Sequence, residues 1–392
     1  MSVNSVAARM DLLNTESAFK ILARANALEA QGRDIVHCEI GQPDFKTPAH
    51  IIEAAHTAMV NGFTGYSPTP GYPRLRQAIA DFYNEHKQIG TRPEEVVVVP
   101  GGKPIMFYTM LMLVDPGDEV ILPDPAFPIY QSCVKFAGGV PVNIPLLAQN
   151  HFRFDLEVLK RSITPRTRLV ILNSPSNPTG GVFHEEDIRE IARILQDRPD
   201  IYILSDEIYD RLVYDMDIAP SIASIPAFKD RTIILNGFSK AYSMTGWRLG
   251  YGIMNEELAR QMELLMVNSN SCAASFTQIA AIEALTGPQD SVAEMKEAFR
   301  ERRDWLVAAL NDIPGISCFM PKGAFYAFPD ISSFGLGCRE FCERLLTEAG
   351  VAASWGTAFG DAGEGFMRIS YATSMENLKK AVDRIDRFTR TL

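Results

Sequence analysis

Short apolar runs alternate with amphipathic segments through the middle of the chain. From about residue 95, runs rich in β-branched residues, which are typical of buried strands, are separated by stretches with helical spacing. The predicted strands lie in EEVVVVPGG, EVILPDPAF, GGVPVNIPL, RLVILNSPSNPTG, IYILSDEIY, RTIILNGFSK and RLGYGIM. Strands that alternate with helices favour a mainly parallel sheet covered by helices on both faces, so the sequence predicts an α/β fold.

The regions on either side of this pattern are mostly helical or mixed. Apolar residues recur at helical spacing in 15–31, 51–60 and 72–86, and a long helical stretch covers about 279–310. After residue 311, short strands and a helix near 339–349 predict a smaller α+β unit. We therefore predict an N-terminal arm (1–45) that joins the small domain, a large domain (46–290) and a small C-terminal domain (291–392).

Composition and charge argue against several classes of function. Of 392 residues, 46% are hydrophobic and 22% charged, and the formal net charge is −10, without a run of Lys or Arg that would suit nucleic acid. No apolar stretch reaches the ~18 residues of a membrane span, and the N-terminus lacks the apolar core of a signal peptide. Cys338 and Cys342 lie one helical turn apart but have no His nearby. We expect a cytoplasmic protein with reduced thiols, no metal, and no nucleic-acid or membrane partner.

Chemistry-bearing residues follow the predicted strands, at the edge where parallel sheets usually bind ligands. The stretch GFSKAYSMTGWRLG, 237–250, contains Lys240 and Arg248. A lysine in a crowded, partly dry site tends to lose its proton and become a nucleophile, and an arginine holds an anionic ligand through paired hydrogen bonds. Taken alone, this stretch also fits a surface lysine and a structural arginine.

Three further strand ends carry weaker signals. Asp206 follows a buried run in SDEIYD, with Tyr209 three residues later; a buried carboxylate requires a partner such as a protonated ring nitrogen, or it caps the next helix. In NSPSNPTG, prolines stiffen a loop that either presents Asn177 to a ligand or is a plain turn. PGGKP, 100–104, ends a strand and begins a helix whose N–H groups suit a phosphate. Each motif alone is ambiguous.

In this order, the motifs resemble those of the class I and II aminotransferases, which are pyridoxal phosphate enzymes of fold type I. Residues 237–250 resemble the lysine signature of that family over its full length, and the similarity extends from GQPDF near residue 41 to MRIS near residue 370. The resemblance implies a sheet of the seven-stranded type, pyridoxal 5′-phosphate as cofactor, and a homodimer with shared active sites. It also implies that an amino group moves between an L-amino acid and a 2-oxo acid by a ping-pong mechanism.

The resemblance implies a role for each matching residue around the cofactor ring. Lys240 would bind the cofactor covalently and, once freed by substrate, move the proton between the substrate α-carbon and cofactor C4′. Asp206 would keep the ring nitrogen protonated, so that the ring accepts electrons. Tyr209 and Asn177 would hydrogen-bond the phenolic oxygen, and Phe127 would stack on the ring face. The groups implied for the phosphate are the main chain of Gly102 and Lys103, the side chains of Ser239 and Arg248, and Tyr66 reaching from the partner subunit.

For the substrate, the resemblance implies that Arg368 in MRIS binds the α-carboxylate and that Gly41 closes over it. The sequence departs from common family patterns at two places. Gly237 stands where many relatives have a serine for the phosphate, so Ser239 gains importance. Trp355 precedes GTAFG, where many relatives have a proline. Either Trp355 affects the choice of substrate side chain, or it packs as an ordinary tryptophan.

Two other functions fit the same residues. The Lys, Asp and Arg set is shared with other reactions on this fold, such as those of β-C–S lyases, cyclopropane-forming synthases and decarboxylases. A ligand-sensing regulator would join the fold to a DNA-binding segment, but the roughly forty residues before GQPDF contain no basic helix-turn-helix. No residue marks a second carboxylate pocket, so aspartate, alanine, aromatic and branched donors stay open, with a mild preference for aspartate or a small neutral amino acid.

Overall fold

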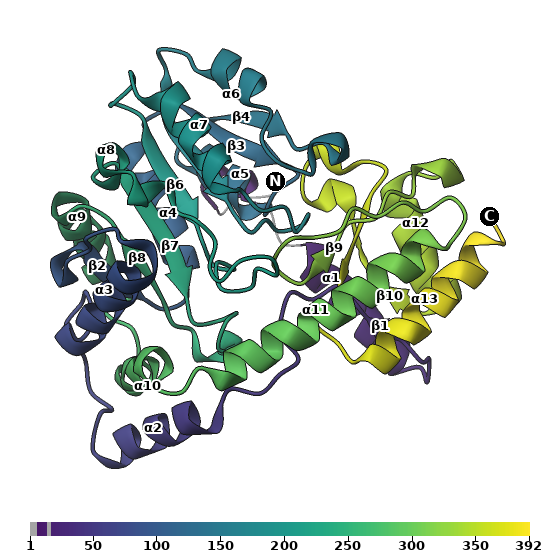
Figure 1. Cartoon of the computed structure of the whole chain (residues 1–392), viewed down its shortest axis with the longest axis horizontal. Helices are drawn as coiled ribbons and strands as arrows, with labels where there is room; N and C mark the ends of the chain where they lie inside the picture. The colour runs from purple at the N-terminus through teal and green to yellow at the C-terminus, as the bar shows by residue number, and fades with distance from the viewer. Residues whose placement is uncertain (1–5, 14–16) are drawn as a thin grey trace.

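The computed structural model describes residues 6–13 and 17–392 and is built around one large sheet (Figure 1). The sheet has seven strands in the order β2-β8-β7-β6-β5-β3-β4, and only β8 runs antiparallel to its neighbours. The predicted mainly parallel α/β fold is therefore confirmed, and each predicted strand overlaps an observed one. The strands are β2 (Val96–Val99), β3 (Glu119–Asp124), β4 (Val140–Pro145), β5 (Thr167–Asn173), β6 (Tyr202–Asp206), β7 (Thr232–Gly237) and β8 (Gly250–Ile253).

Alternate residues of each strand are buried on opposite faces of the sheet, as the two-residue period of a strand requires. In β5, Leu169 and Ile171 pack against one layer of helices, while Val170 and Leu172 pack against the other. The first layer contains α4 (Lys103–Leu113), α5 (Ile129–Phe136) and α9 (Glu256–Val267). The other contains α2 (Ala49–Val60), α3 (Pro73–Lys87), α6 (Leu156–Ser162), α7 (Glu185–Leu195), α8 (Pro226–Lys229) and α10 (Ser275–Thr286).

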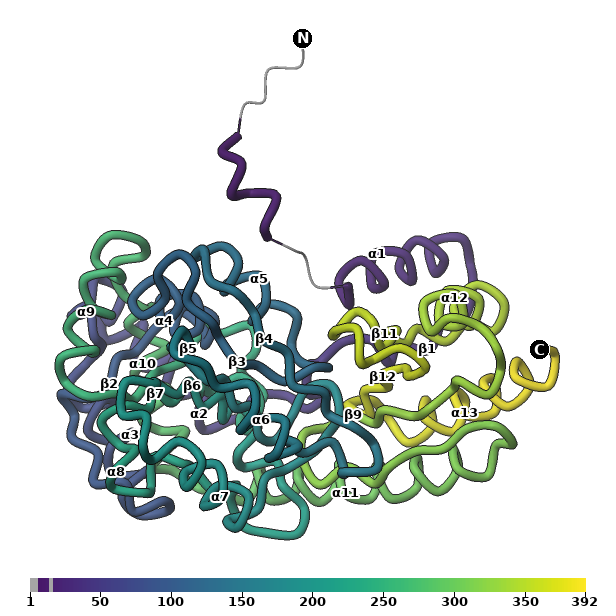
Figure 2. The backbone as a smooth tube through the Cα atoms, turned by 90° about the horizontal axis from the view of Figure 1, so that it is seen from above, coloured from purple at the N-terminus to yellow at the C-terminus, as the bar shows by residue number. Residues whose placement is uncertain are grey.

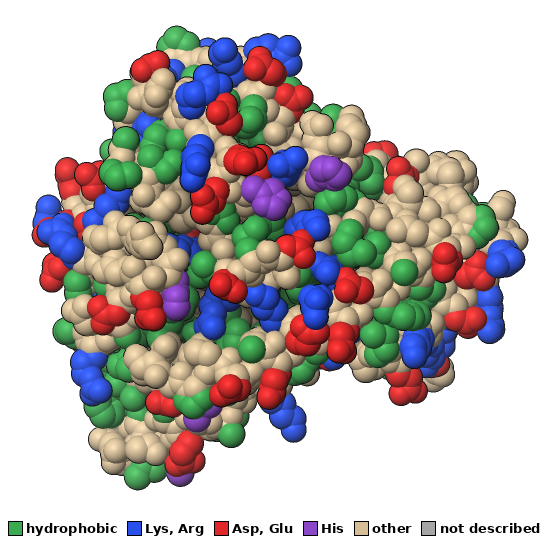
Figure 3. Space-filling view, viewed as in Figure 1, with side chains coloured by type: hydrophobic (Ala, Val, Ile, Leu, Met, Phe, Trp, Pro, Cys, Tyr) green, Lys and Arg blue, Asp and Glu red, His purple; other side chains and the backbone are tan. Residues whose placement is uncertain are grey.

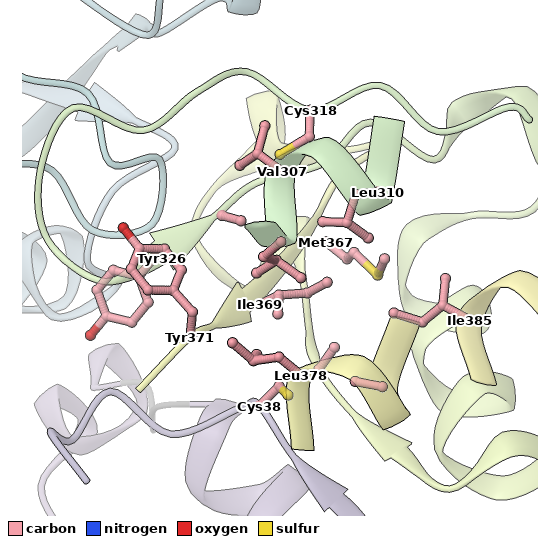
Figure 4. Packing of buried hydrophobic residues seen from close by; sticks show 14 of the residues in the cluster. Cys38, Val307, Leu310, Cys318, Tyr326, Met367, Ile369, Tyr371, Leu378 and Ile385 are labelled. Carbon is pink, nitrogen blue, oxygen red and sulfur yellow. The ribbon is translucent and has the colours of Figure 1, made fainter. Parts of the chain in front are cut away.

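A smaller α+β region lies beside the large sheet, and the long helix α11 (Asp290–Asn311) runs from one to the other (Figure 1). Its three-stranded antiparallel sheet has the order β11-β12-β9. The apolar side chains between this sheet and its helices form one buried cluster, part of which is seen in Figure 4. The elements are β9 (Tyr326–Ala327), α12 (Cys338–Arg344) with a π-turn at Leu345–Ala349, β11 (Ser354–Trp355), β12 (Met367–Ser370) and α13 (Met375–Thr389).

The N-terminal segment joins this smaller region. The strand β1 (Val36–His37) pairs in parallel with β10 (Val351–Ala352), and α1 (Ser17–Glu29) lies on the same side (Figure 2). The short 3-10 helix Ala8–Leu12 has no buried residue and stands off the body in the same view. The domain limits at 45 and 290 stay a prediction.

Two predicted helices differ in detail from the observed ones. The stretch 279–310 is two helices, α10 and α11, because Gly287 and Pro288 interrupt it and proline has no N–H to continue the helical bonds. The predicted helix 15–31 corresponds to α1, and its first two positions lie outside the described residues.

The surface carries both signs of charge. In Figure 3, Lys and Arg side chains are intermixed with Asp and Glu over the visible face. Within residues 6–13 and 17–392, none of the helices combines the length and the apolar character that crossing a bilayer requires.

Candidate active site

A cavity of about 630 Å³ opens at the carboxyl ends of the parallel strands, where the large sheet faces the smaller region. The ends of parallel strands meet at one edge of a sheet, so loops far apart in sequence converge there. Tyr66 does not line this cavity; its side chain is 91% exposed. The other eleven predicted site residues all line it: Gly41, Gly102, Lys103, Phe127, Asn177, Asp206, Tyr209, Ser239, Lys240, Arg248 and Arg368.

Lys240 enters the cavity from the loop that follows β7. Its Nζ donates a hydrogen bond to the carbonyl oxygen of Gly41 and lies 5.6 Å from the ring centroid of Tyr209. It also lies 5.7 Å from the ring centroid of Phe325. The amine therefore lies between the sheet edge and the segment that was predicted to close over the substrate.

Asp206 ends β6 and is 5% exposed. Burial raises the pKa of its carboxyl group to about 6, although the Tyr130 hydroxyl and the Ile208 N–H donate to it at 2.6 and 3.2 Å and oppose that shift. The bond from Ile208 shows that Asp206 also holds the turn that follows β6, while its pairing with a ring nitrogen stays a prediction. A cation beside this carboxylate would stabilise its charged form.

Tyr209 contacts a residue that sequence reasoning missed. Its hydroxyl lies 2.7 Å from the hydroxyl of Tyr326 on β9, and burial raises the pKa of Tyr209 well above its usual value. The Tyr326 ring also occupies the space beside Gly41, where an added Cβ would collide with the Tyr326 hydroxyl. Glycine at position 41 therefore allows the chain to pass close to this tyrosine.

Arg368 lies on β12, is 3% exposed and is held from several directions. One guanidinium nitrogen donates to Asn177 Oδ1 at 2.9 Å, and another donates to the main-chain carbonyl of Glu39. The rings of Tyr326 and Phe359 lie 4.5 and 4.8 Å from Cζ, measured to their centroids. A guanidinium fixed in this way is prepared to bind a planar carboxylate through two parallel hydrogen bonds.

Three close-packed glycines, Gly101, Gly102 and Gly250, lie where α4 begins, and Gly102 lines the cavity. Gly102 caps α4, and a Cβ added to Gly250 would lie 2.7 Å from the Gly102 nitrogen and 2.8 Å from the carbonyl carbon of Gly101. Arg248 has a left-handed backbone with φ of 52° and lies directly beside Gly101. A helix N-terminus next to an arginine is a favourable site for a phosphate.

The structure explains one departure from the family pattern. Gly237 pairs with Gly250 across β7 and β8, and a Cβ on Gly237 would lie 3.0 Å from the Gly250 Cα. A serine would crowd this pairing, so packing favours glycine here. Ser239 lies nearby and lines the cavity.

Trp355 does not line the cavity. It packs against a buried cluster that contains Ile21 and Ala25 of α1 with Ile35, Leu346 and Ala352, and the Arg339 guanidinium carbon lies 5.4 Å from its ring centroid. The packing interpretation therefore fits Trp355, and an influence on the substrate side chain has no support from its position.

The paired cysteines belong to the buried apolar cluster of the smaller region. Cys338 and Cys342 are buried, and Cys338 Sγ lies 3.3 Å from Thr357 Oγ1. Over the part of the chain that the structure describes, no three His, Cys, Asp or Glu side chains are grouped so as to hold a metal ion.

Sequence comparison places the chain among known proteins. The family model described as aminotransferase class I and II matches residues 33–385. The chain is 41% identical to an aspartate aminotransferase of Bacillus sp. (strain YM-2), over 98% of this chain and 99% of that protein. It is 41% identical to a probable aspartate/prephenate aminotransferase of Aquifex aeolicus, over 97% of each.

Solved structures agree with the sequence matches. The aspartate aminotransferase from Rhizobium meliloti superposes with a TM-score of 0.94 at 38% identity, covering 99% of both chains. The alanine aminotransferase from Pyrococcus furiosus superposes with a TM-score of 0.92 at 33% identity, covering 99% of this chain and 100% of the other. These relatives favour amino transfer over the lyase and regulator alternatives.

Proposed function

The chain belongs to the class I and II aminotransferases, and we propose from this premise that its amino donor is aspartate or another dicarboxylic amino acid. As an aminotransferase, it moves an amino group between an L-amino acid and a 2-oxo acid by a ping-pong mechanism. Enzymes of this family use pyridoxal phosphate. The proposal for this chain therefore has two parts: how its site holds that cofactor and how it selects the substrate.

The observed residues fit pyridoxal phosphate. The buried carboxylate of Asp206 lines the cavity, as do Gly102 at the N-terminus of α4 and Arg248, which would bind the phosphate. Lys240 would hold the cofactor covalently, Asp206 would accept a hydrogen bond from its ring nitrogen, and Phe127 would stack on its ring. The bound cofactor supplies an electron sink for the electron pair left when the substrate α-carbon loses its proton.

The chain's own residues would then control the substrate and the proton. Arg368 would bind the α-carboxylate, while Asn177 and the Glu39 carbonyl keep its guanidinium in place. Freed by the incoming amine, the Lys240 amine would take the proton from the α-carbon. Gly41, whose carbonyl oxygen already accepts a hydrogen bond from Lys240, would help to exclude water from the substrate.

The observation that carries the choice of donor is the position of Lys103. Of the described residues that line the cavity, those with a cationic side chain are Lys103, Lys240, Arg248 and Arg368. The last three have proposed roles toward the cofactor and the α-carboxylate. Lys103 Nζ lies 5.5 Å from the ring centroid of Phe127, which also lines the cavity. This ammonium is the group that would attract a second carboxylate, and the aspartate aminotransferases among the relatives agree with that preference.

A charge-removing variant tests this choice. Lys103→Met is expected to lower kcat/KM for aspartate by about 10- to 100-fold, since a hydrogen bond to a charged group contributes about 1.5–3 kcal/mol, while alanine loses about threefold at most. Lys135→Met, on α5 and outside the cavity lining, is the matched control. Equal losses for aspartate and alanine would reject Lys103 as the selective residue.

The proposal includes a homodimer with shared sites. Tyr66 is 91% exposed and cannot serve the cavity of its own chain as it stands. It follows a run of exposed apolar side chains, Met59, Val60 and Phe63, at 42%, 73% and 37% exposure. Apolar side chains gathered on a surface are typical of an interface, and a second copy would place Tyr66 at its phosphate site.

A further inference from the structure

We infer that Lys87, at the end of α3 and outside the cavity, is a positioning residue that holds Asp206 and Tyr209 in place from behind the active site. Lys87 is absent from the cavity lining, so it acts through other residues. The inference rests on the proposed roles of Asp206 and Tyr209 toward the cofactor, and it adds a group that contacts neither cofactor nor substrate.

The turn after β6 points its side chains in two directions. Asp206 and Tyr209 line the cavity, whereas Glu207 and Asp210, which directly follow them, face away toward α3. Lys87 Nζ lies 2.5 Å from Glu207 Oε2 and 2.7 Å from Asp210 Oδ2. One ammonium therefore joins the residue after Asp206 to the residue after Tyr209. Movement of either active-site side chain along the turn would stretch one of these ion pairs.

The cluster is buried and internally bonded. The side chains of Lys87, Glu207 and Asp210 are 2%, 2% and 4% exposed. Glu207 Oε1 also accepts from the hydroxyls of Ser205 and Ser221, at 2.8 and 2.5 Å. Burial opposes the charge of the ammonium, but the two carboxylates outweigh burial and raise the pKa of Lys87, so it stays charged. Buried charges with this geometry permit little displacement, because separating them leaves each unpaired.

The same turn of α3 contacts the strand that leads to Lys240. Lys87 Nζ lies 5.2 Å from the ring centroid of Tyr83, and the Tyr83 hydroxyl accepts from Asn236 Nδ2 at 2.8 Å. Asn236 lies near the end of β7, four residues before Lys240. The end of α3 thus contacts the ends of both β6 and β7. It fixes the distance between Asp206, which is proposed to bind the ring nitrogen, and Lys240, which is proposed to bind the cofactor's aldehyde carbon.

A merely structural ion pair would also be sensitive to substitution, so the test needs a matched pair elsewhere. Lys229 Nζ lies 3.2 Å from the buried Glu95 and donates to the Gly90 carbonyl at 2.6 Å, and neither residue of that pair lines the cavity. Lys229→Met therefore breaks a lysine–glutamate contact without touching the turn. Lys87→Met removes both ion pairs to the turn, but it also leaves the two buried carboxylates of Glu207 and Asp210 without their cation. Lys87→Met with Asp210→Asn keeps the cluster's net charge at that of the wild type.

The experiment compares these holoenzymes in three measurements: the rate of pyridoxal phosphate release, the absorbance spectrum of the bound cofactor across pH, and kcat and KM for aspartate. Lys87→Met and the double variant should release cofactor about tenfold faster and lose about tenfold in kcat, with KM changed by less than about threefold, because the cofactor-side groups are displaced while Arg368 is not. Lys229→Met should match the wild type in all three.

The inference is overturned if the Lys87 variants show wild-type cofactor release and spectrum and differ only in melting temperature, as Lys229→Met would. Should Lys87→Met fail to fold, the charge-balanced double variant and Asp210→Asn alone decide, since each retains Glu207 bonded to two serine hydroxyls. Asp206→Asn distinguishes a failure of this inference from a failure of the proposed function. If Asp206→Asn also leaves the rate of cofactor release unchanged, the proposed role of Asp206 is wrong.

Discussion

The two ends of the cavity are assembled in different ways. The part of the cavity proposed for the cofactor, here the cofactor end, uses residues between about 100 and 250, each placed by a strand end or turn of the seven-stranded sheet. The part proposed for the substrate α-carboxylate is the carboxylate end. The carboxylate end joins Arg368 to the carbonyl of Glu39, 329 positions away in the chain. That second contact depends on pairing between the chain's early and late segments: Cys38 donates its N–H to the Ala352 carbonyl at 2.9 Å, and Ser370 donates to the Cys38 carbonyl at 2.8 Å.

This difference separates chemistry from substrate binding. The cofactor end is part of a continuous hydrogen-bonded sheet with a buried core on both faces, so its groups keep fixed positions. At the carboxylate end, Arg368 donates to Asn177 and to the Glu39 carbonyl, and the second contact depends on the two-residue strands β1 and β10. Changes at the cofactor end should therefore lower kcat and cofactor retention, whereas changes at the carboxylate end should mainly raise KM.

The largest effect is expected from Lys240→Ala. Removing the nucleophile should lower turnover by at least about 10³-fold, because covalent attachment and proton transfer are lost together. Steady-state turnover with aspartate and 2-oxoglutarate measures it. As a control, Lys322→Ala should keep wild-type turnover, because Lys322 is a half-exposed lysine that pairs with Asp215 at 2.7 Å and lies outside the cavity lining. Substantial activity in Lys240→Ala would show that Lys240 is not the nucleophile and would contradict the proposed cofactor end.

A subunit-mixing experiment asks whether the cofactor end is complete in one chain. Lys240→Ala and Tyr66→Ala should each be nearly inactive, but a mixed dimer contains one site with both wild-type residues. Random mixing should restore about a quarter of wild-type activity, since half of the dimers are mixed and each has one intact site. The measurement is activity after joint refolding of equal amounts. No recovery, with dimers present by size-exclusion chromatography, would contradict the sharing of Tyr66.

Arg368→Lys tests the carboxylate end. The paired hydrogen bonds of the guanidinium are lost, so kcat/KM should fall by about 10- to 100-fold, chiefly through KM. Arg303→Lys is the control, because Arg303 is also buried (6% exposed) and stacks on Tyr214 at 4.4 Å but lies outside the cavity lining. If Arg368→Lys lowered only kcat and left KM unchanged, Arg368 would not act in substrate binding, and its assignment to the carboxylate end would be wrong.

The smallest effect is a gain of stability in the cofactor-free protein. Burial raises the pKa of Asp206 from 3.8 to about 6, so the folded state binds more protons than the unfolded state between these values, and stability falls as pH rises through that window. Above pH 6 the penalty is constant. Asp206→Asn removes the penalty and should stabilise the cofactor-free protein at pH 7 by about 1–3 kcal/mol. Urea unfolding at pH 4 and pH 7 measures it. A gain that is equal at both pH values would contradict this origin.

Sequence alone could predict most of the cofactor end. Lys240, Asp206 and Gly102 each lie within five residues of the end of an apolar run, and parallel strands necessarily bring such positions to one edge. The same reasoning could also have identified Tyr130, which donates a hydrogen bond to Asp206, because it lies three residues after Phe127 at the start of α5. Local pattern was sufficient here because the sheet supplies the long-range geometry.

The carboxylate end was harder to predict from the sequence. Arg368 was identified from the family motif, but Glu39, Tyr326 and Phe359, which fix its guanidinium, carry no local signal. Their contacts arise only when β1 pairs with β10 and β12 lies between β9 and β11. The buried Lys87 was missed for a related reason: a lysine at the end of an amphipathic helix ordinarily faces solvent, and its partner Glu207 lies 120 residues further along.

The most direct test is borohydride reduction of the holoenzyme followed by peptide mapping. The account predicts one stable pyridoxyl adduct, on the peptide that contains Lys240, and loss of the cofactor's visible absorbance. An adduct on Lys103 or another lysine, or protein that retains no vitamin B6 derivative through purification, would contradict it.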